Sequence, residues 1–187
     1  EGYRSSDDSY GVLYLLHGMW GDETDWTEKG NMQQICDAFY AAHPDEKRIV
    51  VMTDAGNNWY RDSYDDSWKY ETFYFDELMK EIESAYRVKT DATHRAIAGL
   101  SMGGYGSLDY ALRHTDLFSA CYAMSAAVWG PGAKGHENEE DYVAWANAND
   151  PTELIKGLSE EQKKALRILL DCGDDDFLLE GNLQLYR

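Results

Sequence analysis

Residues 93–112 read THRAIAGLSMGGYGSLDYAL, and this stretch decides how the rest of the chain is organised. A short apolar run, residues 96–98, leads directly into Gly99-x-Ser101-x-Gly103, and apolar positions then recur with the period of a helix. The order predicts a strand, a sharp turn and a helix, with glycines where the turn is too tight for side chains. Ser101 would take a strained backbone conformation at the positive end of that helix, with its hydroxyl exposed as a nucleophile.

The composition is that of a single packed domain. Of the 187 residues, 43% are hydrophobic and 13% aromatic, and the formal net charge is −18. Phosphate groups would repel such a surface, so we expect no nucleic-acid partner and no membrane association. The sequence has neither a run of 18 apolar residues nor a signal-peptide pattern, which favours the cytoplasm, with secretion as the alternative if a leader was removed.

Four more apolar runs have the length of a strand, at residues 12–16, 48–53, 118–127 and 165–171. They do not alternate with polar residues, which is typical of strands buried on both faces of a parallel sheet. Helical patterns lie between them, at residues 31–40, 72–86 and from 159 onward, where Ser159 and Gln162 form a capping-box signature. In the second helix the apolar stripe is predicted to comprise Phe73, Leu78, Ile82 and Tyr86. Alternating strands and helices predict an α/β fold with a mostly parallel sheet.

A change of composition separates residues 129–157 from the rest of this pattern. The segment is rich in Gly, Asn, Glu and Asp with scattered aromatic residues, and it is longer than an ordinary connection between a strand and a helix. We therefore predict a single domain over residues 1–187, with a lid-like insertion at about residues 129–157 near the mouth of the site.

Ligands of parallel sheets bind at the carboxyl ends of the strands. Here those ends are residues 17–19, 54–60, 101, 125–129 and 174–176. An activated serine also needs a base, and His43, His94 and His114 are placed too far along their own segments to reach Ser101. His17 and His136 stay open as minor alternatives, His17 being more simply an anchor for its own loop. Because the usual chain order is serine, acid, histidine, the base is expected beyond Arg187.

Three consecutive aspartates, residues 174–176, follow the last predicted strand. They are either a solvated loop or the acid that orients the base, and their position favours the acid. A metal site is a weaker alternative because no second ligand cluster has a matching spacing. No metal and no organic cofactor are therefore expected.

These stretches resemble the putative esterase family of α/β-hydrolases, which includes feruloyl and other carbohydrate esterases, tributyrin-type esterases, S-formylglutathione hydrolase and the mycolyltransferases. The matching residues are 12–18, 51–60, 77–78, 95–106 and 172–178. The resemblance implies a three-layer α/β-hydrolase sandwich. The family's first antiparallel strands and its final histidine-bearing segment have no counterpart here, so the domain is expected to be truncated at both ends.

The resemblance also implies roles for particular residues. Ser101 would be the nucleophile and Asp176 the acid, and the backbone N–H groups of Met19 and Met102 would form the oxyanion hole. The implied activity is that of a serine carboxylesterase acting on a feruloyl, acyl-carbohydrate or short-chain acyl ester through an acyl-enzyme, with acyl transfer as the nearby variant.

Two further inferences depend on the residues themselves. The aromatic side chains Trp20, Trp59 and Trp129 would suit a phenolic acyl group or a sugar in the substrate. The alternative to an esterase is a catalytically incomplete fragment or degenerate homologue that acts at most as a binding module. A Gly-His followed by an aromatic residue in the codons after Arg187 would support the enzyme, and a stop codon there the alternative.

Overall fold

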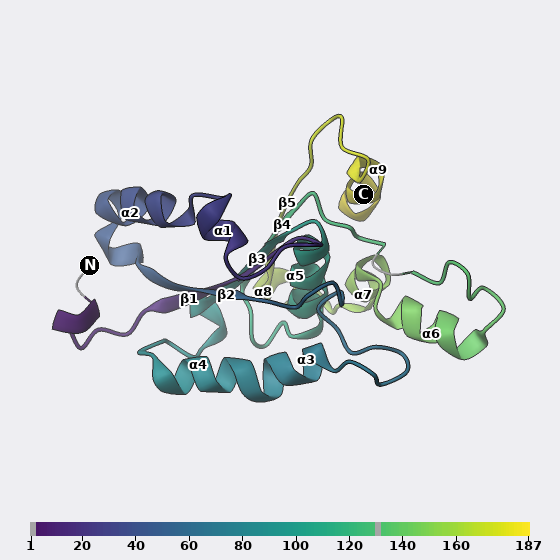
Figure 1. Cartoon of the computed structure of the whole chain (residues 1–187), viewed down its shortest axis with the longest axis horizontal. Coiled ribbons are helices and arrows are strands. Elements are labelled where there is room, and N and C mark those ends of the chain that lie inside the picture. Colours follow the sequence, from purple (N-terminus) through teal and green to yellow (C-terminus); the bar gives the residue numbers. More distant parts are fainter. Residues whose placement is uncertain (1–2, 130–131) are drawn as a thin grey trace.

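The computed structural model describes residues 3–129 and 132–187, and its centre is a five-stranded parallel sheet between helices (Figure 1). The strands are β1 (Gly11–Leu16), β2 (Arg48–Thr53), β3 (Arg95–Leu100), β4 (Ala120–Met124) and β5 (Arg167–Asp171). Their order across the sheet is β2-β1-β3-β4-β5, and every neighbouring pair is parallel. The chain moves to one side after β1 and to the other side for β3, so the topological switch point, where ligands of such sheets bind, lies between β1 and β3.

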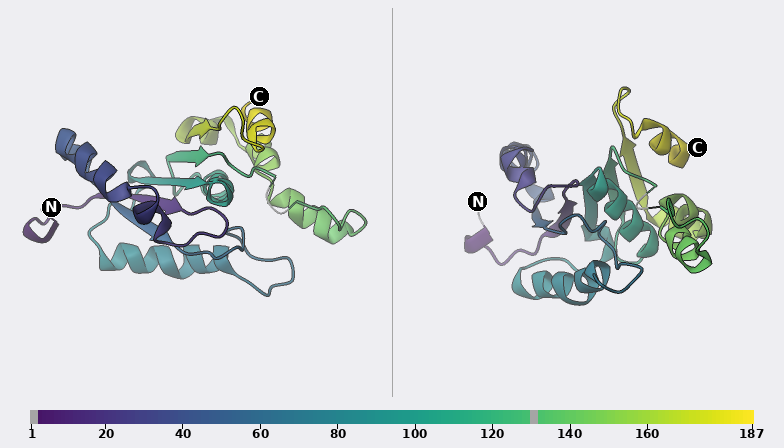
Figure 2. Two further views of the ribbon diagram at one scale, coloured as in Figure 1. Left: turned by 45° about the horizontal axis from the view of Figure 1, so that its top comes forward. Right: turned by 45° about the vertical axis from the view of Figure 1, so that its right-hand side comes forward.

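The helices form the two outer layers. They are α1 (Asp25–Glu28), α2 (Met32–Ala42), α3 (Tyr70–Phe73), α4 (Met79–Ala85), α5 (Met102–Arg113), α6 (Glu140–Ala148), α7 (Pro151–Gly157), α8 (Glu160–Ala165) and α9 (Leu179–Tyr186). Helix α2 lies on one side of the sheet and the α3–α4 segment on the other (Figures 1 and 2). Helix α5 packs directly on β3 and β4. The predicted three-layer α/β arrangement is confirmed. In the described part of the chain, no helix has the length and apolarity needed to cross a bilayer.

The core is built around tyrosines from several elements. Tyr14 on β1 is fully buried, and its ring lies edge-on against Tyr74 at 5.8 Å and Phe118 at 6.2 Å between centroids. Tyr110 on α5 joins the same cluster, 4.7 Å from Tyr74. Burial of each such side chain stabilises the fold by about 1.5–3 kcal/mol. The cluster therefore fixes α5, the helix after Ser101, against the strand that precedes the His17 loop.

The segment from α3 to α4 corrects one prediction. Phe73 and Tyr86 are exposed, and the fully buried side chains are instead Tyr70, Tyr74 and Met79. Between α3 and α4 the chain forms a π-helical turn, Tyr74–Leu78. This turn adds one residue to the spacing of the buried side chains, so Tyr74 lies four positions after Tyr70, whereas Met79 lies five positions after Tyr74. Of the four predicted residues, Leu78 and Ile82 pack against the core as expected, and the prediction is wrong for Phe73 and Tyr86.

The predicted strand at residues 118–127 is shorter in the structure, because β4 covers only Ala120–Met124. The insertion also differs from a simple loop, since its described part, from residue 132, contains α6 and α7; residues 130 and 131 lie outside the described residues. The capping box is present at α8, where Ser159 Oγ accepts from the Gln162 amide at 3.2 Å and Gln162 Oε1 accepts from the Ser159 amide at 3.0 Å. The single domain and the lid-like role of residues 129–157 stay predictions.

Candidate active site

Ser101 alone forms the turn between β3 and α5. Its backbone has φ 56° and ψ −110°, a strained conformation for a residue other than glycine. A Cβ on Gly99 would lie 2.1 Å from Gly103 O, and a Cβ on Gly103 would lie 2.4 Å from Leu16 O. Three backbone hydrogen bonds fix the turn. The Ser101 amide donates to Met124 O at 2.9 Å, and Ser101 O accepts from the amides of Tyr105 and Ala127, each at 3.0 Å. The spacing of the two glycines therefore follows from backbone contacts on both sides of the serine.

Backbone strain gathers at this edge of the sheet. Five non-glycine residues with positive φ directly follow or lie shortly after the first four strands: Trp20, Trp59, Tyr60, Ser101 and Ser125. Each such conformation costs on the order of 1–3 kcal/mol and persists only where the surroundings hold it. The strain thus marks the carboxyl edge as the functional edge of the molecule.

The loop after β1 lies beside the serine. A Cβ on Gly18 would lie 3.6 Å from Ser101 Cβ. In this loop the Trp20 amide donates to Asn57 Oδ1 at 2.7 Å. Within the described part of the chain, we find no acceptor for the amide of Met19 or for that of Met102, the first residue of α5. Two free amides therefore flank the switch point, and the positive end of α5 favours negative charge there.

His17 is buried and anchors this loop to the next one. Its Nε2 accepts the Ala55 amide at 3.0 Å, so Nδ1 carries the proton and donates to Gly18 O at 2.7 Å. Asp54 Oδ1 is farther from Nε2, at 3.4 Å, and the Tyr60 hydroxyl donates to His17 O at 2.9 Å. Both ring nitrogens are engaged by the backbone, so neither is available to take a proton from the serine.

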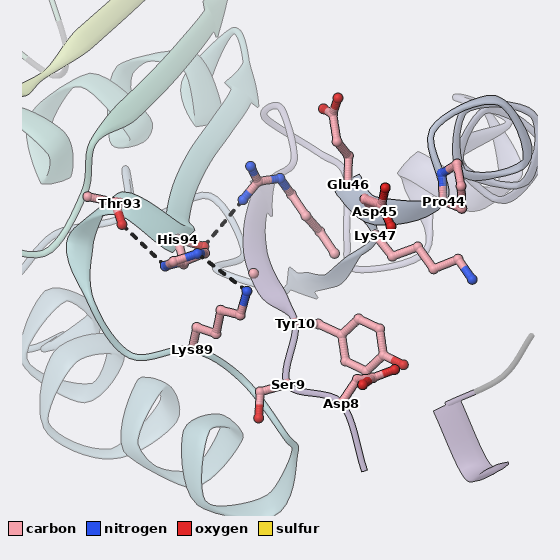
Figure 3. Close-up of a pocket in the computed structure, with 12 residues that line it drawn as sticks. Asp8, Ser9, Tyr10, Pro44, Asp45, Glu46, Lys47, Lys89, Thr93 and His94 are labelled. Atoms are coloured by element: carbon pink, nitrogen blue, oxygen red, sulfur yellow. Dashed lines mark hydrogen bonds between the residues drawn. The ribbon is translucent and has the colours of Figure 1, made fainter. Parts of the chain in front are cut away.

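The other histidines have partners elsewhere. His94 precedes β3 and lines a cavity of about 640 Å³ at the amino-terminal edge of the sheet, opposite to Ser101, where it lies beside Thr93 and Lys89 (Figure 3). His136 pairs with Glu139 at 2.8 Å and stacks on Tyr142. Among the described residues, no hydrogen bond joins a histidine to Ser101.

Asp176 is linked to the end of β4. Its Oδ1 accepts the Leu178 amide at 2.9 Å, and this bond together with one from the Ser125 hydroxyl holds the pKa of Asp176 below its ordinary value. Ser125 follows Met124, whose carbonyl oxygen accepts a hydrogen bond from the amide of Ser101. Asp176 therefore belongs to the edge that carries the serine, and its side chain is ionised at neutral pH. In residues 3–129 and 132–187, no three potential metal ligands gather.

The predicted aromatic residues are only partly brought together. The rings of Trp59 and Trp129 are 5.7 Å apart, and Trp59 also lies edge-on to Tyr105, at 5.6 Å. The Tyr105 amide bonds to Ser101 O at 3.0 Å, which places this pair beside the turn. Trp20 is 83% exposed and makes no ring contact with another described aromatic side chain.

Sequence reasoning missed a buried charged cluster behind α5. Arg113 Nε donates to both carboxylate oxygens of Asp109, at 3.0 and 3.1 Å, and lies 3.9 Å from Glu71 Oε1. Burial raises the pKa of Asp109 to about 6 against the lowering effect of Arg113. Burial, reinforced by Asp109, raises the pKa of Glu71 to about 7. The spacing of Asp109 and Arg113 by four residues on one helix is the local signal that could have indicated the pair.

Substituting Glu71 tests the cost of this cluster. The folded-state pKa of about 7 lies above the ordinary value of 4.5, so ionised Glu71 destabilises the fold increasingly as the pH rises from about 4.5 to 7. Glutamine mimics the protonated acid, so Glu71→Gln is expected to gain stability over the parent between pH 5 and pH 8, by about 2 kcal/mol in urea unfolding. Glu77→Gln, an exposed position on the same helical segment, should show no such trend. An equal trend in both variants would contradict the assignment.

Comparison with known proteins gives a consistent set of relatives. Residues 1–185 match the family described as putative esterase. An acetyl esterase of Caldicellulosiruptor saccharolyticus is 28% identical over 94% of this chain and 69% of its own length. Esterase Rv1288 of Mycobacterium tuberculosis is 35% identical over 78% of this chain, which spans 30% of that protein. A solved ferulic acid esterase matches with a TM-score of 0.84 and 37% identity, over 99% of this chain and 75% of that one.

Proposed function

This chain belongs to the putative esterase family, with relatives named acetyl esterase and ferulic acid esterase, and on that premise we propose that it is a serine carboxylesterase acting through an acyl-enzyme on Ser101. The observation that carries the proposal is the strained turn at Ser101, with φ 56° and two flanking glycines that admit no side chain. A turn of this kind presents the serine hydroxyl at the switch point of the sheet, next to two free amides. These are the parts that nucleophilic attack on an ester carbonyl requires.

The steps follow from this arrangement. Ser101 Oγ forms a bond to the ester carbonyl carbon, and the Met19 and Met102 amides bind the oxygen that gains negative charge. Collapse of this intermediate breaks the bond to the alcohol, which leaves with the proton that the base took from the serine. Water then attacks the acyl-enzyme in the same way and releases the acid. In comparable enzymes, each amide donor of an oxyanion hole lowers the activation free energy by about 3 kcal/mol.

The base in this proposal is a histidine outside residues 1–187. His17 is engaged on both ring nitrogens, and no hydrogen bond joins another described histidine to the serine. Asp176 would orient that histidine, since its lowered pKa keeps the carboxylate ionised, as an orienting acid requires. The Ser125 hydroxyl and the Leu178 amide hold the carboxylate in place.

The aromatic pair suggests the substrate. Trp59 and Trp129 offer a ring surface next to the nucleophile, and Trp129 is 52% exposed. Aromatic faces bind planar acyl groups and sugar rings. Together with the relatives named ferulic acid esterase and acetyl esterase, this supports a feruloyl, acyl-carbohydrate or short-chain acyl ester as the substrate.

Labelling with a fluorophosphonate tests both the nucleophile and the origin of the base. We expect a polypeptide continued past Arg187 by its gene to react with the probe, and residues 1–187 alone to react at least 10³-fold more slowly. Ser101→Ala should abolish the label in the longer form, whereas Ser84→Ala, on the exposed face of α4, should retain it. A label on Ser101 in residues 1–187 at full rate would show that the base lies within this chain. A folded longer form that takes no label would overturn the esterase mechanism.

A further inference from the structure

We propose that Arg61 is a positioning residue for the ester: it fixes helix α6 and the Trp59–Trp129 pair beside Ser101 and thereby sets the affinity for the aromatic part of the substrate. The inference rests on the proposed function. The guanidinium of Arg61 is buried, and no step of the proposed reaction uses it.

Arg61 is buried in an unusual way for a charged side chain. It is 3% exposed, its Nη1 donates to the Tyr105 hydroxyl at 3.0 Å, and its Nη2 is buried without an acceptor. The guanidinium carbon lies 3.8 Å from the centroid of the Trp145 ring, a cation–π contact with α6. Within the described residues Arg61 forms no ion pair, and the carboxyl groups of Asp109 and Glu71 interact with its charge through space. Burying an unpaired charge is costly, so this arrangement holds only because both aromatic partners are fixed.

Both partners belong to the attachment of α6. The Tyr105 hydroxyl, which accepts from Arg61, donates to Asn149 O at 2.8 Å just after the end of α6. Arg113 donates to Asn149 Oδ1 and to Ala148 O, each at 2.6 Å. Two side chains of α5 thus satisfy the carbonyl groups at the end of α6, and Arg61, in the loop after β2, binds one of these side chains, Tyr105. Helix α6 is therefore held at its carboxyl end by α5, the helix that follows Ser101.

The same contacts support the strained loop that carries Trp59. Trp59 and Tyr60 have φ of 59° and 57°, and Arg61 is the next residue. Tyr60 is fully buried against Gly106, where an added Cβ would lie 2.7 Å from Tyr60 Cβ. Two consecutive strained residues persist only when the chain on either side is held, and Arg61 provides the hold on the carboxyl side. Tyr105 completes the link, because its ring contacts Trp59 while its hydroxyl binds Arg61.

The guanidinium of Arg61 therefore connects the Trp59 side of the site, through Tyr105, with helix α6 of the insertion, through Trp145. Loss of Arg61 would remove the contact with Trp145, loosen α6 and let Trp59 relax. The hydrogen bonds of Arg113 to the end of α6 and that of the Ser101 amide to β4 do not involve Arg61 and should remain. Binding of an aromatic acyl group should weaken, and the chemical step should not change. This separates positioning from catalysis in KM and kcat.

The test compares methyl ferulate with methyl acetate in the polypeptide continued past Arg187. For Arg61→Met we expect KM to rise about tenfold for methyl ferulate and less than about twofold for methyl acetate, with kcat for both within about twofold. Arg61→Lys keeps the positive charge over Trp145 but lacks the planar guanidinium that also reaches Tyr105. Its KM for methyl ferulate should therefore lie between that of the parent and that of Arg61→Met. Trp145→Leu removes the same cation–π contact by replacing the ring instead of the charge. If Arg61→Met does not fold, Trp145→Leu should still raise KM for methyl ferulate more than KM for methyl acetate.

Arg95→Met is the matched control. Arg95 is as buried as Arg61 and forms a bidentate pair with Glu83, at 2.6 and 2.8 Å, but it begins β3 at the amino-terminal edge of the sheet. It should lose stability without changing the ratio of the two KM values. Equal rises in KM for both esters with Arg61→Met, or the same ratio with Arg95→Met, would overturn the inference.

A second readout does not depend on activity. In residues 1–187, Arg61→Met should raise amide hydrogen exchange about tenfold in residues 140–149 and 57–60, and Arg95→Met should not. Unchanged exchange there would also overturn the positioning role. If the parent protein hydrolyses neither ester and takes no fluorophosphonate, it is the proposed function that fails, and the exchange result still decides whether Arg61 holds α6.

Discussion

Replacing Ser101 by alanine is expected to lower kcat for ester hydrolysis about 10⁶-fold, with KM within a few-fold of the parent. Alanine cannot form the acyl-enzyme. The two steps of acylation and deacylation are then replaced by a single, slower attack of water on the ester. The Met19 and Met102 amides stay in place, so a residual rate of roughly 10³-fold over the uncatalysed reaction should remain. Steady-state kinetics of the polypeptide continued past Arg187 measure the loss.

The substitution should leave the fold intact, which makes the loss interpretable. Within the described residues the Ser101 hydroxyl has no hydrogen-bond partner, and the turn is held by backbone bonds that alanine keeps. Ser107→Ala is the control on the same helix, since Ser107 Oγ donates to Gly104 O at 3.0 Å and is buried. Ser107→Ala should lower the free energy of unfolding by about 1 kcal/mol and leave kcat unchanged. A fall in kcat of less than tenfold for Ser101→Ala would mean that another group is the nucleophile.

Sequence reasoning succeeds here where the cause is local. The tight turn at Ser101 demands glycines at fixed offsets, a strand buried on both faces demands an unbroken apolar run, and the capping box at Ser159 needs only four residues. Each pattern lies within a few residues of the structure that it determines. The fold and the turn could therefore be predicted from short stretches.

What escaped prediction depends on distant packing. The π turn at Tyr74–Leu78 shifts a helix stripe by one residue, because the aromatic core selects which side chains are buried. The contacts of Arg61 reach Tyr105 and Trp145, which lie 44 and 84 positions further along the sequence, and no periodicity marks them. In α6 the apolar residues are mostly consecutive rather than three or four positions apart, and α7 has only seven residues, so neither sequence shows the period of a helix.

The largest effect on stability is expected from Gly103→Ala. The new Cβ would lie 2.4 Å from Leu16 O and 2.6 Å from His17 O, which are backbone atoms of the interior strand β1 and of the loop that follows it. These atoms cannot turn aside as a side chain does, so either α5 moves away from the sheet or the end of β1 shifts. Overpacking against such a position should destabilise the protein by about 3–5 kcal/mol, or lower its melting temperature by roughly 10 °C.

Gly157→Ala provides the comparison, since an added Cβ there meets nothing within 4 Å. Its free energy of unfolding in urea should stay within about 1 kcal/mol of the parent. If Gly103→Ala were equally mild, the contact of the turn with β1 could not be the reason for the glycine. If it folds with the expected loss, the shift of His17 and Gly18 should carry the Met19 amide away from Ser101. Hydrolysis should then fall by about 10²–10³-fold, the cost of one oxyanion donor, because the contact that requires the glycine also positions the oxyanion hole.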